Sequence, residues 1–415
     1  MQFTPLKPSH WQLHRFETLV AALVFGVCAI FLINNLLPSL NVKESLWQTP
    51  ETLPVIQPVG IDFRIGLFRP GSALLAGESP YTATGINYPP FTMLIGGLFA
   101  LLTEWRGYLL HYGLMVVMNA AAVWLFVRSA VKAFLPSDSM LTSGIFIAVL
   151  AVLEVASFTS YGFAFNLERG NYDIYPLFLS ALFLWLLWKR PDWVWVQVLL
   201  VSMAAHLKLY PAILFVLILW KHGRKSLLPL VVVNLALALC LGPENLWLFI
   251  RRIAFDISER KTTWIGNHSA YAYASFFQYD VQSNAPSVFE LIFLALPVGV
   301  WIAALLRLWR QGYSYRRGVW LFALCIPLMN LLPRVSYDYK LIWFFAPAAV
   351  ILVAESWRFI QGSKTAGITL ATLMVLMMMI HRSFAITPDA FASKYPYLLI
   401  VLIITLILAW TDRQS

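Results

Sequence analysis

The chain is poor in charged residues. Only 12% of its 415 residues are charged, whereas 60% are hydrophobic and the mean hydropathy is +0.71. A soluble domain is usually about a quarter charged. Nearly every stretch between polar breaks is apolar, which excludes an ordinary soluble enzyme. We therefore expect one all-α, polytopic membrane domain spanning residues 1–415.

Cysteine and several catalytic signatures are also scarce. The three cysteines, Cys28, Cys240 and Cys325, lie in apolar runs, and none has a Cys or His partner at metal-ligand spacing. Buried packing is the simplest role for them, and we expect neither a metal nor a cofactor. The sequence contains no Walker A, HExxH or Gly-x-Ser-x-Gly pattern. An ATP-driven pump and the commonest hydrolases therefore lose support.

The basic residues occur in short clusters between apolar runs. A net charge of +10 alone would suit a nucleic-acid partner, but this clustering is typical of the positive-inside rule, so no nucleic acid is expected. If the N-terminus is cytoplasmic and the short segment 91–104 does not cross, every dense basic cluster is cytoplasmic. Residues 38–90 and 250–286 are then the two long outer loops.

The apolar runs predict about 12–13 transmembrane or re-entrant helices, the first of them an uncleaved helix at 18–37. The other long runs lie at 107–127, 143–165, 172–188, 226–249, 287–306, 319–333, 341–356, 365–381 and 396–410. Two further short runs, 193–206 and 209–220, either cross fully or re-enter.

The first outer loop carries an acidic residue in a stretch rich in Gly, Pro and Tyr. Apolar residues at helical spacing between Asp62 and Gly77 predict a short amphipathic helix on the membrane surface. Asp62 either caps this helix or performs chemistry. The "ESPY" and "YPPF" stretches are turns, and we expect their tyrosines, Tyr81 and Tyr88, to contact substrate.

A second polar segment, "NLERGNYD", separates two apolar runs on the same outer side. Its Asn166 and Asn171 are candidate substrate-binding residues. The alternative is a plain polar turn in which Glu168 pairs with Arg169.

A lysine also interrupts the apolar stretch "AAHLKLYP". A lysine at membrane depth is costly and normally faces a cavity or a partner. Lys208 therefore either snorkels to the interface or binds a phosphate, and we favour phosphate because an ammonium group is a compact charge that suits it. The neighbouring His206 is a weaker candidate for the same role.

The last two candidate segments are "IGNHSAYAYASFF" and "RVSYDYKLIW". The first mixes small and aromatic residues with Asn267 and His268, a lining that suits a sugar. The second presents Asp338 and Lys340, for which a surface ion pair is the alternative. Arg251, at the start of the second long outer loop, is a further candidate for binding phosphate.

Together these motifs resemble the polyprenol-phosphate-sugar-dependent glycosyltransferases of the GT-C class, in particular family GT87, formerly DUF2029. That family has an Asp in the first outer loop followed by a "LLxGxxPY…YPP" pattern, which corresponds here to Asp62, "LLAGESPY" (74–81) and "YPP" (88–90). "LKLYP" (207–211) and "GNHS" (266–269) are similar to two further family motifs, so the resemblance runs from about residue 60 to 350. The chain departs from the family where "DYK" replaces a pair of histidines and where "ERGNYD" replaces a Gly-Gln-Val-Asn-like turn.

The resemblance implies a GT-C-like fold in a bacterial inner membrane, with outer-face loops forming an extracytoplasmic active site. It implies an inverting, metal-independent hexosyltransferase that moves a sugar, by default mannose, from a polyprenyl-phosphate donor to a lipid or glycan acceptor. Asp62 is then the general base. The donor-phosphate candidates are Lys208, Lys340, Arg251 and His206. The substrate-binding candidates are Tyr81, Tyr88, Asn166, Asn171, Asn267, His268 and Asp338.

Two other classes remain open at the level of the sequence. A secondary transporter for a small polar or lipid-linked substrate would also have about 12 helices, but paired broken helices in two corresponding halves are expected there and are not evident in the sequence. A flippase for a lipid-linked sugar would need the cations but would have no need of Asp62.

Overall fold

The computed structural model describes residues 60–84, 86–136, 140–252, 266–277, 287–381 and 393–412. These residues form helices joined by short turns, and among them the only β-type pairing is an isolated bridge between Asn267 and Tyr337. The expected all-α membrane fold is confirmed. The helix expected at 18–37 lies outside the described residues, as does most of the loop expected at 250–286.

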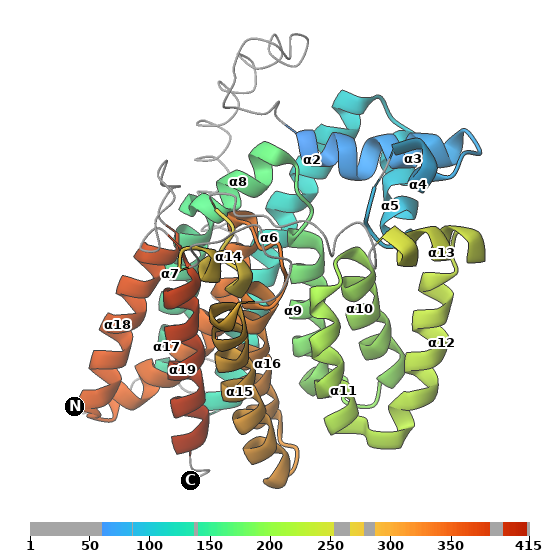
Figure 1. The fold of residues 1–415 in the computed structure, drawn as a ribbon. Coiled ribbons are helices and arrows are strands. Elements are labelled where there is room, and N and C mark those ends of the chain that lie inside the picture. Colours follow the sequence, from blue (N-terminus) through green and yellow to red (C-terminus); the bar gives the residue numbers. More distant parts are fainter. Residues whose placement is uncertain are drawn as a thin grey trace, which may run out of the picture.

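Most helices lie side by side in a bundle, and a few short ones lie across one end of it (Figure 1). The bundle helices are α5 (Pro90–Ala100), α6 (Glu104–Phe134), α7 (Met140–Thr159), α9 (Ile174–Lys189), α10 (Val194–Leu207), α11 (Phe215–His222), α12 (Leu227–Ala238), α15 (Val288–Arg310), α16 (Tyr315–Leu331), α17 (Phe345–Ile360), α18 (Lys364–Ile380) and α19 (Tyr395–Thr411). The short helices at that end include α2 (Ile61–Phe63), α3 (Arg69–Leu75), α4 (Pro80–Thr84), α8 (Tyr161–Arg169), α13 (Pro243–Arg251) and α14 (Ala270–Ser275).

Helix length limits how many of these segments can cross a bilayer alone. By length and composition four described helical segments qualify, Glu104–Phe134, Met140–Thr159, Val288–Arg310 and Asp338–Ile360, or up to five if a bent pair counts as one span. Five further apolar helices have 10–17 residues. About 20 residues span the hydrocarbon core of a typical bilayer. The crossing number near 12 therefore stays a prediction.

One expected span is not a straight helix. The apolar run at 226–249 forms α12 and then breaks, and α13 is bent by 88° from the helical segment before it. The break falls at Gly242, whose φ of 85° is accessible mainly to glycine, and at Pro243, which opens α13. The run at 143–165 also divides, because Ser160 caps the start of α8.

The core surrounds α16 and α17. Almost every residue of α17 from Phe345 to Glu355 is buried, as expected for a helix that is apolar on all sides. By contrast, only 11% of the apolar window of α15 is buried, although α15 is the more hydrophobic of the two. Apolar side chains on that surface suit contact with lipid, since burial inside the protein does not account for them.

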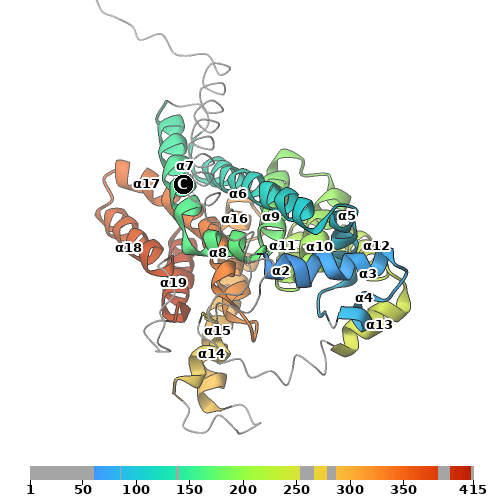
Figure 2. The ribbon, with the colours of Figure 1, turned by 90° about the horizontal axis from the view of Figure 1, so that it is seen from above.

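The segment that carries Asp62 is a continuous helix from Ile61 to Leu75, built from α2, a π-helical turn η1 (Arg64–Phe68) and α3. This agrees with the short helix expected between Asp62 and Gly77. It lies across the end of the bundle (Figure 2) and packs on α5. The contact is backbone to backbone, because a Cβ atom added to Gly71 would lie 2.2 Å from the carbonyl carbon of Gly96. Small residues are what permit this close approach.

The glycine contact yields a stability prediction. Gly71→Ala should lower the thermal unfolding midpoint of the purified protein, because overpacking of this kind costs about 1–3 kcal/mol. Gly113→Ala is the matched control on α6, since its added Cβ meets no atom within 4 Å. Equal unfolding midpoints for the two variants would show that the α3–α5 contact is not tight.

Candidate functional site

Asp62 is held by residues from a distant turn. Its carboxylate accepts hydrogen bonds from Arg169, Nε to Oδ2 at 2.9 Å and Nη2 to Oδ1 at 2.6 Å, and from Nδ2 of Asn171 at 3.0 Å. The N-cap of this helix is Gly60, and each hydrogen bond that the Asp62 carboxylate accepts from a described residue comes from outside its own helix. The capping role is therefore not what the structure shows, and Arg169, which the plain-turn alternative paired with Glu168, binds Asp62.

A glycine makes this arrangement possible. Gly170, between Arg169 and Asn171, ends α8 with a φ of 66°, a left-handed conformation that favours glycine. A Cβ atom at this position would also lie 2.7 Å from Cβ of Phe63, in the helix that carries Asp62. The amide of Gly60 adds a hydrogen bond to the carbonyl of Glu168 at 2.7 Å. The first loop and the turn after α8 are thus joined on both sides of Asp62.

Lys208 lies just after the end of α10, in an extended conformation. Its Nζ is 3.7 Å from Oδ2 of Asp173 and donates to the hydroxyl of Tyr88 at 3.4 Å. It also lies over the rings of Tyr88 and Tyr172, 4.4 Å and 4.2 Å from their centroids. Burial opposes the charged form, but Asp173, Tyr88 and Asp62 together outweigh it and hold the pKa of Lys208 above its usual value. Lys208 therefore does not snorkel.

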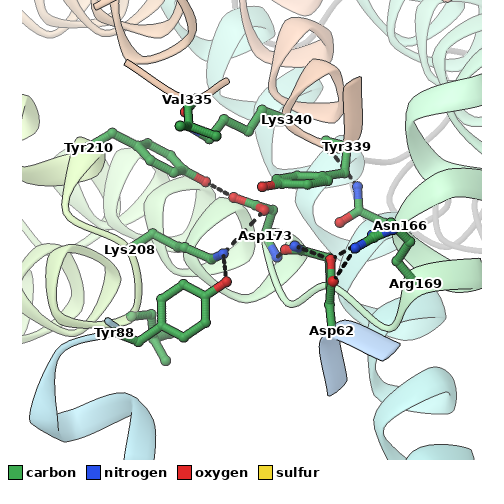
Figure 3. A network of polar contacts seen from close by, with 12 residues as sticks. Asp62, Tyr88, Asn166, Arg169, Asp173, Lys208, Tyr210, Val335, Tyr339 and Lys340 are labelled. Atoms are coloured by element: carbon green, nitrogen blue, oxygen red, sulfur yellow. Dashed lines mark hydrogen bonds and ion pairs between the residues drawn. The ribbon is translucent and has the colours of Figure 1, made fainter. Parts of the chain in front are cut away.

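Asp173 is the residue that the sequence did not single out. Its side chain is fully buried, and it accepts a hydrogen bond from the hydroxyl of Tyr210 in addition to facing Lys208 (Figure 3). Lys340 enters the same cluster from η5 (Asp338–Phe344), with Nζ 4.7 Å from the ring centroid of Tyr210 and bonded to the carbonyl of Val335 at 2.8 Å. Two lysines therefore flank one buried carboxylate.

Asn166 connects the two halves of the cluster. Its Nδ2 donates to the carbonyl of Tyr339 at 2.6 Å and to that of Gly162 at 2.9 Å. The Tyr339 ring lies between the Asp62 and Asp173 groups in Figure 3. A Cβ atom on Gly162 would be 3.0 Å from the carbonyl of Asp338, so α8 and η5 are in close contact. Asn166 thus fixes the position of Tyr339, and its own Oδ1 has no hydrogen-bond partner among the described residues.

A second polar cluster contains Asn267, His268 and the first residue of η5, Asp338. Asn267 donates to the carbonyl of Arg334 at 3.0 Å and accepts from the amide of Ser336 at 2.9 Å. His268 is buried, with Nδ1 3.6 Å from Oδ1 of Asp338. Burial lowers the pKa of His268, although Asp338 opposes that shift. The Asp338–Lys340 pair is therefore not formed, and the amide of Asn267 is occupied by backbone.

The remaining candidates lie to one side of the cluster. The hydroxyl of Tyr81 donates a hydrogen bond to the carbonyl of Tyr88 at 2.8 Å and so helps to hold that residue in place. Nε2 of His206 faces Oδ1 of Asn234, on α12, at 3.2 Å. Arg251 is exposed on α13. Within the described residues, neither His206 nor Arg251 has a hydrogen bond or ion pair to Asp62 or Lys208.

Metal ligation is not a feature of the described part of the chain, where no group of three or more His, Cys, Asp or Glu side chains is placed to hold an ion. Metal-independence itself stays a prediction.

Comparison with known proteins shows which family the chain belongs to. No curated protein matches the chain. The family Glycosyltransferase family 87 matches residues 87–333, which is more than half of the 415 residues. The matched span includes Tyr88, Asp173 and Lys208, whereas Asp62 and Lys340 lie outside it. The chain is a membrane glycosyltransferase and belongs to glycosyltransferase family 87.

Proposed function

We propose that the chain transfers a hexose, by default mannose, from a polyprenyl-phosphate donor to a lipid or glycan acceptor at the extracytoplasmic face of a bacterial inner membrane. The observation that carries the proposal is the lysine box, the buried Lys208 enclosed by Asp173 and the rings of Tyr88 and Tyr172. An ammonium group held in this way, in a chain whose family transfers sugars, suits a phosphate leaving group.

The charge of the cluster favours a phosphodiester. Its cations are Arg169, Lys208 and Lys340, and its anions are Asp62 and Asp173. Three positive and two negative formal charges leave +1. A polyprenyl-phosphate sugar is a phosphodiester with one negative charge, whereas the diphosphate of a nucleotide sugar carries two. A cluster with at most one excess positive charge suits this phosphodiester better than a diphosphate.

Asp62 suits the role of general base. Oδ2 receives hydrogen bonds from both Arg169 and Asn171, whereas Oδ1 receives, from the described residues, only the one from Arg169 Nη2. A carboxylate oxygen offers about two lone-pair sites, so Oδ1 retains one for an acceptor hydroxyl. Arg169 and Asn171 then orient the carboxylate.

The proposed reaction is a direct displacement. The acceptor hydroxyl gives its proton to Asp62 as its oxygen bonds to the anomeric carbon, and the bond from that carbon to the phosphate oxygen breaks. The electron pair leaves with the polyprenyl phosphate, whose charge Lys208 stabilises, with Lys340 behind it. Attack from the face opposite the phosphate inverts the anomeric configuration.

The first prediction concerns Asp62. Purified protein should transfer sugar from a polyprenyl-phosphate donor, and Asp62→Asn should lower turnover by about 10² to 10⁴ while donor binding persists, because general-base loss has that scale. Asn171→Ala removes one orienting hydrogen bond but keeps the base, and should cost about tenfold or less. Glu104→Gln, at a carboxylate paired with Arg64, is the control. Near-normal transfer by Asp62→Asn at matched expression would remove Asp62 from this role.

The second prediction concerns Lys208. Lys208→Ala should raise the donor concentration needed for half-maximal rate and lower turnover by about 10² or more, the scale for one preorganised electrostatic group. Lys208→Arg should recover only part of this, since the planar guanidinium does not reproduce a compact ammonium. Lys221→Ala is a matched control, as that lysine binds a carbonyl of Leu187 instead. Unchanged donor dependence in Lys208→Ala would move the phosphate site elsewhere.

The third prediction concerns sidedness. The turns between α11 and α12, between α15 and α16, and between α17 and α18 all lie at the end opposite α2 and α3 in Figure 1. In a background without native cysteines, Glu78→Cys should react with an impermeant thiol reagent added outside intact cells, because Glu78 is exposed between α3 and α4, at the same end of the bundle as α2 (Figure 1). Lys225→Cys and Gln361→Cys, also exposed, should be shielded. Labelling of Lys225→Cys in intact cells would invert the topology.

A further inference from the structure

Tyr339 is a tyrosine that lies between the proposed base and the lysine box. Its side chain is held firmly, since the residue is only 8% exposed. Asn166 donates to its carbonyl at 2.6 Å, and its ring stacks on that of Phe165 with the two centroids 6.1 Å apart. Nζ of Lys208 lies 5.7 Å from the centroid of the same ring. Tyr339 is therefore fixed in one position next to Lys208.

The hydroxyl of Tyr339 is not used by the fold. It has no hydrogen-bond partner among the described residues. Tyr172 of the lysine box also has an unpaired hydroxyl, but that one is enclosed by protein, whereas the hydroxyl of Tyr339 is not. A tyrosine as buried as this one usually pairs its hydroxyl. The hydroxyl of Tyr339 is thus both unpaired and open to a ligand.

This hydroxyl points into the middle of the polar cluster. In Figure 3 the ring of Tyr339 extends from the side of Asn166 toward Asp173, with the hydroxyl at its far end. The hydroxyl interacts electrostatically with the carboxylates of both Asp173 and Asp62. Asp62 is the proposed base, and Asp173 holds Lys208. A ligand that lies between the base and the ammonium group therefore meets the hydroxyl of Tyr339.

The proposed displacement places the sugar ring of the donor beside this hydroxyl. The attacking oxygen at Asp62 and the leaving oxygen at Lys208 lie on opposite faces of the anomeric carbon. A group between them meets the edge of the sugar, where the neighbours of that carbon are the ring oxygen and carbon 2. The ring oxygen loses electron density in an oxocarbenium-like transition state and becomes a poor hydrogen-bond acceptor. The hydroxyl on carbon 2 is the neighbour that remains available.

We propose that Tyr339 binds the 2-hydroxyl of the transferred sugar and so sets the specificity of the enzyme at carbon 2. The 2-hydroxyl donates to the phenol oxygen. As positive charge develops at the anomeric carbon, the 2-hydroxyl becomes a stronger donor, so the bond contributes most in the transition state. This hydroxyl is axial in mannose and equatorial in glucose, and a fixed tyrosine reaches it in only one of the two. The inference rests on the proposed function, from which it takes the donor and the reaction.

Transfer kinetics with paired donors test the inference. Purified full-length protein is given polyprenyl-phosphate mannose, polyprenyl-phosphate glucose or the 2-deoxy donor that corresponds to both, with membranes from a deletion strain as the source of acceptor. The ratio of kcat/KM for the preferred hexose to that for the 2-deoxy donor should fall about tenfold in Tyr339→Phe, the scale of one hydrogen bond. The intrinsic reactivity of the 2-deoxy sugar cancels in this comparison of ratios.

Tyr172→Phe is the matched control. It removes a hydroxyl from a second tyrosine whose ring also contacts Lys208, but that hydroxyl is enclosed. Whatever its effect on the rate, Tyr172→Phe should keep the wild-type ratio between the two donors. The thermal unfolding midpoints of both variants show whether a change in the ratio accompanies a loss of stability.

Four results would count against this account. A wild-type ratio retained in Tyr339→Phe would overturn the role of Tyr339 and leave the proposed function intact. An equal fall in Tyr172→Phe would assign the effect to ring packing instead of the Tyr339 hydroxyl. Equal use of mannose and glucose donors by the wild type would show, without any variant, that carbon 2 is not read. No transfer from either hexose donor would overturn the proposed function and the inference together.

Discussion

The ion pair between Asp62 and Arg169 is the contact on which the arrangement of the site depends. It joins a helix that lies across the end of the bundle to the turn between α8 and α9, and that turn carries Asn171 and Asp173 as well. The left-handed Gly170 allows Arg169 and Asn171 to meet Asp62 from adjacent positions. The surface helix, which also packs on α5 and pairs Arg64 with Glu104, is thereby fixed to the core at its first turn.

A second buried pair completes the site. Lys208 follows the end of α10, and Asp173 precedes the start of the neighbouring helix α9. Their side chains face each other at these helix ends. A buried lysine without a partner would lose its charge, and Asp173 and the surrounding tyrosine rings prevent that. The two pairs lie in one network, so the proposed base and the proposed phosphate ligand are positioned by the same turn.

The sequence predicted most helices well, because a long apolar run has few alternatives to a helix. It did not predict the bends at Gly242 and Ser160, since local turn chemistry overrides an apolar pattern there. Asp62 and Lys208 were identifiable because charge is costly in such surroundings. Asp173 was not, because its partner Tyr210 is 37 residues away in sequence. The sequence offered Glu168 as an alternative partner for Arg169, but adjacent residues on a helix do not face each other, and Arg169 binds Asp62.

The most direct test of the account is a structure of the protein with a non-transferable analogue of a polyprenyl-phosphate sugar. The account predicts that the phosphate lies within hydrogen-bonding distance of Nζ of Lys208, with the anomeric carbon between it and Oδ1 of Asp62. A phosphate bound instead at His206 or Arg251, with Lys208 still enclosed by Asp173 and the tyrosines, would contradict the account.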